Sequence, residues 1–140
     1  MKKTILIPAA VIILSFALCI SLLQSHTGQT AKLEVLCQSS INAAEEHFAN
    51  YASEGKEADY LAGISEFRAY MTMRQALAKD AADTEYLWCN TLYGYMTIKP
   101  DAVKAHCTDL AAALSPFADD YNHPNGFQRI HALNNLLHAE

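Results

Sequence analysis

The chain has 140 residues, of which 51% are apolar and 18% charged, and its net charge is −5. This length allows one domain plus a short extra segment, and the apolar fraction is too high for an intrinsically disordered chain. The acidic balance argues against nucleic-acid binding, which requires a basic surface.

The N-terminal region separates basic from acidic charge. Lys2 and Lys3 are the only charged residues before Lys32, and the rest of the chain holds 8 basic and 15 acidic residues, a net charge of −7. The 20 residues Thr4–Leu23 carry no charge. As a helix they would measure about 30 Å, the thickness of the hydrocarbon core of a membrane. We therefore predict four parts, with the lysines on the cytoplasmic side: a cytoplasmic stub at 1–3, a transmembrane segment at 4–23, a juncture at 24–31 and an extracytoplasmic domain at 32–140.

The charge-free segment has a second interpretation as a cleaved signal peptide. A cleaved signal has an apolar region of about 7–15 residues and a small-x-small cleavage site. The apolar stretch here is longer, and Leu23 stands where a cut at Ser25 would need a small residue. Cys19 would suggest a lipoprotein, but it follows Leu18 instead of a small residue. We favour an uncleaved single-pass anchor in the cell membrane over secretion after signal cleavage.

Residues 32–140 show helical periodicity between breakers. The first helix is predicted from Lys32 to Ala52, and Gly55 is expected to cap it in the left-handed conformation. Asp59 is a candidate N-cap for a second helix that ends near Lys79. On this second helix we expect Arg74 to face water. The apolar positions of the two helices recur at helical spacing: Leu33, Cys37, Ile41, Ala44, Phe48 and Tyr51, then Tyr60, Ile64, Phe67, Met71 and Ala78.

The third predicted helix begins with Asp83 or Thr84 as its cap and ends at Ile98, because Pro100 disfavours helical backbone at Lys99. It is apolar on nearly every side, and a helix without a polar face is either central or covers a partner. Its aromatic side chains combine a large apolar area with a polar group, which is common in binding patches. They are the candidate partner-binding residues Tyr86, Trp88, Tyr93 and Tyr95.

A fourth helix is predicted to start at Pro100 and to bend or end near Leu114, ahead of Pro116. A turn at residues 122–126 precedes a fifth, shorter helix. The expected inward residues are Val103, Cys107, Leu110, Leu114, Phe117 and Tyr121, then Phe127, Ile130, Leu133 and Leu137. The predicted fold is therefore all-α, an antiparallel bundle of four to five helices behind one N-terminal transmembrane helix.

Cys89 and Cys107 are equally distant from the predicted turn at Ile98–Pro100, so we expect them at one level on neighbouring helices. An oxidising exterior would favour a disulfide between them, and the alternative is two buried thiols. The same reasoning brings Cys37 and His138 towards this layer. These four side chains are the candidates for a zinc or copper(I) site, although core packing is the better interpretation.

The sequence contains no HExxH, G-x-S-x-G or glycine-rich phosphate loop, and it predicts a protein that is not an enzyme and carries no cofactor. We expect a non-catalytic, membrane-anchored, extracytoplasmic interaction or accessory protein that binds a protein or peptide partner. The alternative is a helical bundle that binds a small ligand or metal through the cysteine layer or the aromatic third helix. Self-association into a homo-oligomer is compatible with both.

Overall fold

The computed structural model describes the backbone of residues 3–78 and 83–139 and the side chains of residues 27–78 and 83–139. The chain divides into two compact units, Met1–Lys32 and Leu33–Glu140. No helix among the described residues is long and apolar enough to cross a membrane. The predicted span Thr4–Leu23 lies outside the residues whose side chains are described, and its backbone is helical.

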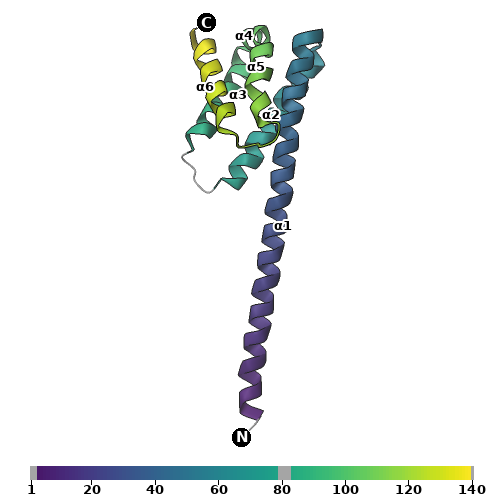
Figure 1. Cartoon of the computed structure of the whole chain (residues 1–140), viewed down its shortest axis with the longest axis vertical. Coiled ribbons are helices and arrows are strands. Elements are labelled where there is room, and N and C mark those ends of the chain that lie inside the picture. The colour runs from purple at the N-terminus through teal and green to yellow at the C-terminus, as the bar shows by residue number, and fades with distance from the viewer. Residues whose placement is uncertain (1–2, 79–82, 140) are drawn as a thin grey trace. The chain divides into compact units, whose positions relative to one another are not determined.

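All regular structure in the described residues is helical, and the second unit is a bundle (Figure 1). This confirms the all-α prediction. The elements are α1 (Lys3–Glu54), α2 (Glu57–Leu77), α3 (Thr84–Ile98), α4 (Pro100–Ala105), α5 (Cys107–Leu114), the short 3₁₀ helix η1 (Ser115–Phe117) and α6 (Pro124–Ala139).

The connection between α1 and α2 is tight. The helix predicted to start at Lys32 is the C-terminal part of α1, so the expected juncture at 24–31 is helical as well. Gly55 ends α1 with a φ of 68°, and its N–H donates to the carbonyl of Tyr51 at 2.8 Å, as predicted. The predicted cap at Asp59 is wrong, because α2 already starts at Glu57 after Lys56. Asp59 instead lies in the first turn, where its charge complements the helix dipole.

Between Asp83 and Phe117, the ends of α3 agree with the prediction, but the helix predicted to follow it is divided into α4 and α5. The Asp83 carboxylate accepts a hydrogen bond from the Glu85 N–H at 2.9 Å, so Asp83 caps α3 as expected. The single helix predicted from Pro100 is interrupted at His106, where ψ is 20° and the N–H bonds to the Val103 carbonyl at 3.0 Å. The helical stripe is nevertheless buried on both sides of this break, at Val103, Cys107, Leu110, Leu114 and Phe117.

The core is rich in aromatic side chains, and two glycines allow its helices to approach. A Cβ at Gly63 would lie 2.7 Å from the ring of Phe48, and one at Gly126 would lie 2.3 Å from the ring of Phe117. Both distances are shorter than van der Waals contact, so these positions require glycine. Six aromatic residues are at most 1% exposed: Phe48, Tyr60, Phe67, Tyr70, Phe117 and Phe127.

The buried tyrosines have partners for their hydroxyl groups. Tyr60 donates to the Met96 carbonyl at 3.1 Å, and Tyr70 donates to the Tyr121 carbonyl at 2.8 Å. These bonds satisfy polar atoms that would otherwise destabilise the core. The predicted inward face of the last helix is also confirmed, since Phe127, Ile130, Leu133 and Leu137 are buried.

Candidate functional site

The helix α3 has three kinds of surface. Its inner side consists of Cys89, Leu92 and Met96, each at most 1% exposed. The four aromatic candidates for partner binding are partly buried and pack against the core from its flanks. They do not form one patch, because Tyr86 and Tyr93 bond to residues of α2, whereas Trp88 and Tyr95 contact α6.

On the α2 flank, both tyrosine hydroxyls are engaged within the chain. Tyr86 donates to Gln75 Oε1 at 3.1 Å. Tyr93 accepts a hydrogen bond from Arg68 Nη1 at 3.4 Å, and the guanidinium carbon of Arg68 lies 5.8 Å from the tyrosine ring centroid. These contacts fix the orientation of two rings that remain partly exposed.

On the α6 flank, the aromatic rings pair with histidines. Trp88 stacks on His131 with ring centroids 4.6 Å apart and an interplanar angle of 21°. The Tyr95 hydroxyl lies 3.3 Å from Nδ1 of His138. Asn134, which is 6% exposed, donates to the Trp88 carbonyl at 2.8 Å and thereby adds a buried polar bond to the α3–α6 contact.

Between the two flanks lies the outer face of α3, which we define as Leu87, Thr91, Gly94, Thr97 and Ile98. Leu87 is 58% exposed and Ile98 is 80% exposed. None of the exposed residues of α3 is charged; they are Thr84, Leu87, Asn90, Thr91, Thr97 and Ile98. The sequence predicted an apolar helix here, but it did not show which side would be left exposed.

The polar groups of the outer face are turned back onto the helix. Thr91 Oγ1 donates to the Leu87 carbonyl at 2.9 Å, and Thr97 Oγ1 donates to the Gly94 carbonyl at 2.9 Å. Each hydroxyl hydrogen is therefore used within α3. A Cβ built at Gly94 would have no atom within 4 Å. The outer face is consequently an open, uncharged and largely apolar surface.

A second polar feature is the buried Arg74, which the sequence interpretation wrongly placed in water. It is 5% exposed, and its guanidinium lies 2.6 Å from a carboxylate oxygen of Asp83 and 2.6 Å from one of Glu85. Its Nε donates to Asn122 Oδ1 at 3.1 Å, and its guanidinium carbon lies 4.4 Å from the ring centroid of Phe127.

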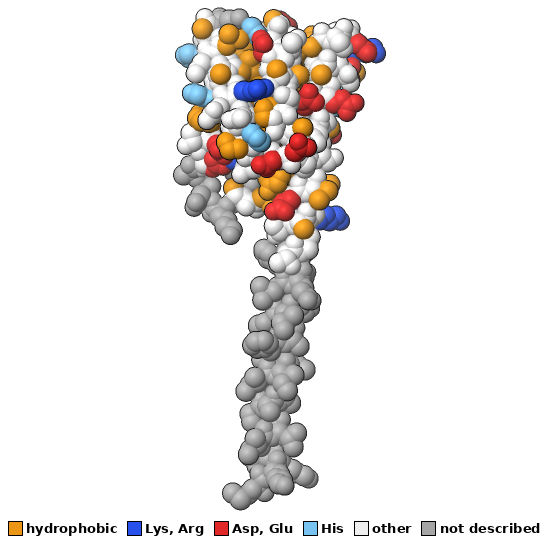
Figure 2. Space-filling view, viewed as in Figure 1, with side chains coloured by type: hydrophobic (Ala, Val, Ile, Leu, Met, Phe, Trp, Pro, Cys, Tyr) orange, Lys and Arg blue, Asp and Glu red, His pale blue; other side chains and the backbone are white. Residues whose placement is uncertain are grey.

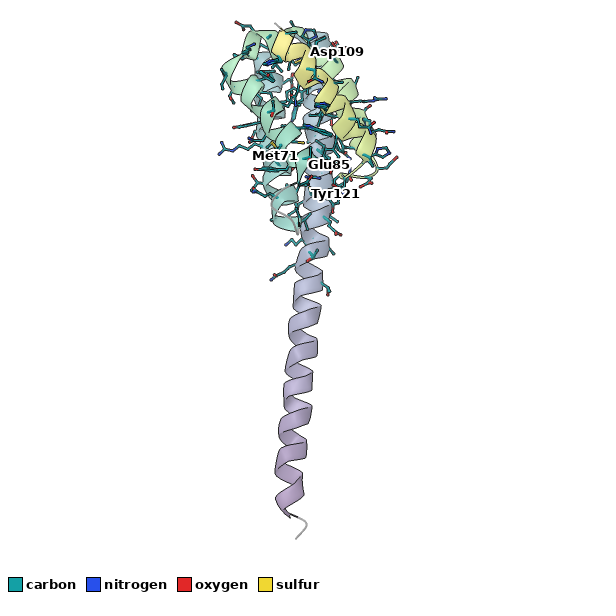
Figure 3. All side chains as sticks on the ribbon, turned by 90° about the vertical axis from the view of Figure 1, so that its left-hand side faces the viewer. Met71, Glu85, Asp109 and Tyr121 are labelled. Atoms are coloured by element: carbon teal, nitrogen blue, oxygen red, sulfur yellow. The ribbon has the colours of Figure 1, made fainter. Side chains whose placement is uncertain are left out.

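The Arg74 cluster joins the end of α2 to the start of α3 and to the turn before α6. Figure 3 shows Glu85 with Met71 and Tyr121 towards one end of the bundle and Asp109 at the other end. Burial raises the pKa of Glu85, and the positive charge of Arg74 opposes this shift. One guanidinium and two carboxylates leave this cluster with a net negative charge, and because each carboxylate already contacts Arg74, the cluster stabilises the fold. Position 74 continues the stripe of Phe67 and Met71, but the spacing does not show that Asp83 and Glu85 would be placed to accept a buried arginine.

The three cysteines among the described residues are buried free thiols. Burial raises the pKa of Cys37 and Cys89 to about 12 and that of Cys107 to about 11. Arg74 partly offsets this effect at Cys37 and Cys89, whereas Lys104 does so at Cys107.

The protonated thiols are poor nucleophiles and poor metal ligands, because both roles require the thiolate. In the described part of the chain, no three His, Cys, Asp or Glu side chains gather closely enough to hold a metal ion. His138, a candidate ligand, instead contacts Tyr95. Cys89 and Cys107 are not bonded to each other in the structure, and their disulfide under oxidising conditions stays a prediction.

Two open grooves lie elsewhere on the bundle. One, of about 410 Å³, runs between α5 and α6, and the other, of about 460 Å³, lies between α1 and the α5–η1 segment. The first is lined by alanine and leucine side chains together with Asp109 and Arg129. The Asp109 carboxylate lies 3.0 Å from Nδ1 of His106, and Arg129 donates to the Ala112 carbonyl at 2.8 Å. The second is bordered by Glu45 and Glu46. The second groove also contains Ser115, whose hydroxyl donates to the Ala112 carbonyl at 3.0 Å and is therefore not directed at either glutamate.

The chain matches no protein-family model, no curated protein and no solved structure.

Proposed function

We propose that the protein is a non-catalytic, membrane-anchored interaction protein whose helical unit lies outside the cytoplasmic membrane and binds a protein partner through α3. One observation carries this proposal: the outer face of α3 exposes Leu87 and Ile98 and has no charged residue. Exposed apolar surface of this kind is typical of protein–protein contacts.

The flanking aromatic residues suit the rim of such a contact. Tyr86, Trp88, Tyr93 and Tyr95 are partly exposed, and each is held by a contact within the bundle. Side chains that are ordered before binding lose less conformational entropy when the complex forms. Their apolar rings would enlarge the contact area on either side of the outer face.

The anchor is supported by the charge pattern of the sequence. Thr4–Leu23 carries no charge and follows Lys2 and Lys3, whereas residues 32–140 have a net charge of −7. Basic residues on the short N-terminal side favour retention of that side in the cytoplasm. The acidic helical unit would then lie on the opposite side of the membrane.

The membrane proposal is tested with the full chain expressed in cells. After an alkaline carbonate wash the chain should stay in the membrane pellet, and protease added outside intact spheroplasts should degrade the helical unit. Release of a shortened chain into the medium would show signal cleavage instead. Extraction of the full-length chain by carbonate would contradict the anchor.

The partner proposal is tested by a photo-crosslinking amino acid placed at Leu87 in the full chain, within its native membrane. Leu61 on α2 provides a matched control, because it is 59% exposed and Leu87 is 58% exposed. We expect a discrete crosslinked protein, identified by its peptide masses, at position 87 and not at position 61. Equal crosslinking at both positions, or none, would contradict binding through α3.

A further inference from the structure

We propose that the partner of the outer face of α3 is a second copy of the same chain, with the two α3 helices antiparallel. The inference rests on the proposed function, because it concerns the same face and uses the membrane anchor to bring the copies together. Four features support it: the symmetric spacing of the outer-face residues, the open surroundings of Gly94, the lack of charge on the exposed residues of α3, and an area that suits a weak dimer.

Four of the five residues of the outer face have a spacing that is the same from either end of the helix. The spacing of Leu87, Thr91, Gly94 and Ile98 is 4, 3 and 4, so these residues lie on one side of the helix. An antiparallel pair centred on them places Leu87 beside the partner's Ile98 and Thr91 beside the partner's Gly94. Large residues then meet at both ends and small residues in the middle, which is the self-complementarity that a twofold interface requires.

The described residues of the chain leave the space around the Cβ position of Gly94 open. Gly63 and Gly126 are needed because a Cβ would collide with Phe48 or Phe117, but a Cβ at Gly94 meets no described atom within 4 Å. Glycine inside a helix is nevertheless unfavourable compared with alanine. A second helix that crosses α3 at this point would explain the residue, since only glycine lets two helix backbones come closest together.

Charge restricts where two identical copies can meet. Residues 32–140 have a net charge of −7, and acidic side chains occupy several places on the face shown in Figure 2. Two such faces would repel each other, whereas the exposed residues of α3 are uncharged. An antiparallel arrangement also sets the positive end of each helix dipole beside the negative end of the other.

The available area predicts a weak dimer that depends on the membrane. The helix α3 has 15 residues, about 22 Å in length, so one helix pair buries less than the roughly 1,000 Å² of a stable interface in solution. Anchoring both copies in one membrane raises their effective concentration and permits a weak contact to persist. The twofold axis of such a pair is the membrane normal, so the antiparallel arrangement requires each α3 to lie along the membrane surface. We therefore expect self-association of the anchored chain and little of it in dilute solution.

The test uses the full chain in phosphatidylethanolamine–phosphatidylglycerol vesicles, in a Cys19→Ser background, with the variants Leu87→Cys and Ile98→Cys. Vesicles that contain both variants should form disulfide-linked dimers when an oxidant is added. Either variant alone should not, because identical residues would lie about 16 Å apart, well beyond the Cα separation of about 4.4–6.8 Å that a disulfide needs. The background chain without new cysteines is the control for its three buried thiols.

The variant Gly94→Leu separates loss of pairing from loss of folding. It should reduce the crosslinked dimer about tenfold, a typical loss when a central contact is blocked. The melting temperature should not fall, because the site is open and leucine favours helix. Ser65→Leu, which places the same side chain on the exposed side of α2, should leave crosslinking unchanged.

Each result decides the inference. Crosslinking of Leu87→Cys alone would show parallel helices, and no crosslinking in chains that float with the vesicles would show that the outer face does not pair with a second copy. Both overturn the proposal. Failure of the chain to float with vesicles would instead contradict the anchor, and crosslinking of the concentrated soluble chain would then decide self-pairing separately.

Discussion

The inner and outer faces of α3 contain similar residues in opposite surroundings. Leu92 on the inner face is fully buried, whereas Leu87, five residues earlier, is 58% exposed. The inner face is held by packing, so changes there should affect folding of the chain. The outer face is exposed and is less constrained by packing, and we propose that it serves an interaction outside the chain. Substitutions on the two faces should therefore separate stability from association.

The largest expected difference between the two faces is in thiol reactivity. Burial raises the pKa of Cys89 to about 12 from an ordinary value of 9.0. At pH 8 the thiolate fraction then falls from about one in ten to about one in ten thousand. In the reduced Leu87→Cys chain, we expect Cys89 to be alkylated about a thousandfold more slowly than the new cysteine.

Peptide mass mapping after timed exposure to iodoacetamide measures both rates in one sample. Denatured chain, in which all thiols should react alike, is the control. Equal rates at positions 87 and 89 in the folded chain would mean that the inner face of α3 is open to solvent.

Truncation of leucine should distinguish the faces by stability. Leu92→Ala removes a fully buried side chain and should lower the free energy of unfolding by about 2–5 kcal/mol. Leu87→Ala should change it by no more than about 0.5 kcal/mol. Chemical denaturation of the full chain in detergent, followed by circular dichroism, measures both, and similar losses would contradict the orientation of α3.

Loss of Arg74 should lower the free energy of unfolding, because its cluster joins the end of α2 to the start of α3. Arg74→Ala leaves Asp83 and Glu85 without their shared cation and should cost about 3 kcal/mol, the lower end for breaking a buried ion pair, because both carboxylates are partly exposed. The same denaturation experiment measures the change. Asp109→Ala, which alters a carboxylate far from this cluster, is the control; an equal effect of the two would contradict the role given to Arg74.

The smallest changes in the free energy of unfolding are expected when two glycines are replaced by alanine, and the two changes should have opposite signs. Gly126→Ala should destabilise the fold by about 1–3 kcal/mol, because its Cβ would lie 2.3 Å from the ring of Phe117. Gly94→Ala should stabilise the single chain by up to about 1 kcal/mol, because its surroundings are open. Melting curves of the two variants provide the comparison. A loss of stability in Gly94→Ala would show that α3 needs this glycine for its own fold.

The sequence by itself determined the helical class, most helix ends and most buried stripes. Gly55, Asp83 and Pro100 act through their own backbone or through a residue two positions away, so their effects can be read locally. The stripe of the last helix was also predictable, because apolar residues recur at helical spacing between polar ones. Such features depend on interactions between residues that are close together in the sequence.

Only the tertiary structure decided the orientation of α3, the burial of Arg74 and the break at His106. A helix that is apolar on nearly every side has no pattern to show which side faces the core, and the outer face therefore became visible only when α2 and α6 covered the flanks. Arg74 is buried because carboxylates from another helix start neutralise it. The break at His106 leaves the buried stripe intact, so the spacing of apolar residues carries no sign of it. These features depend on contacts between distant segments, which a local pattern does not contain.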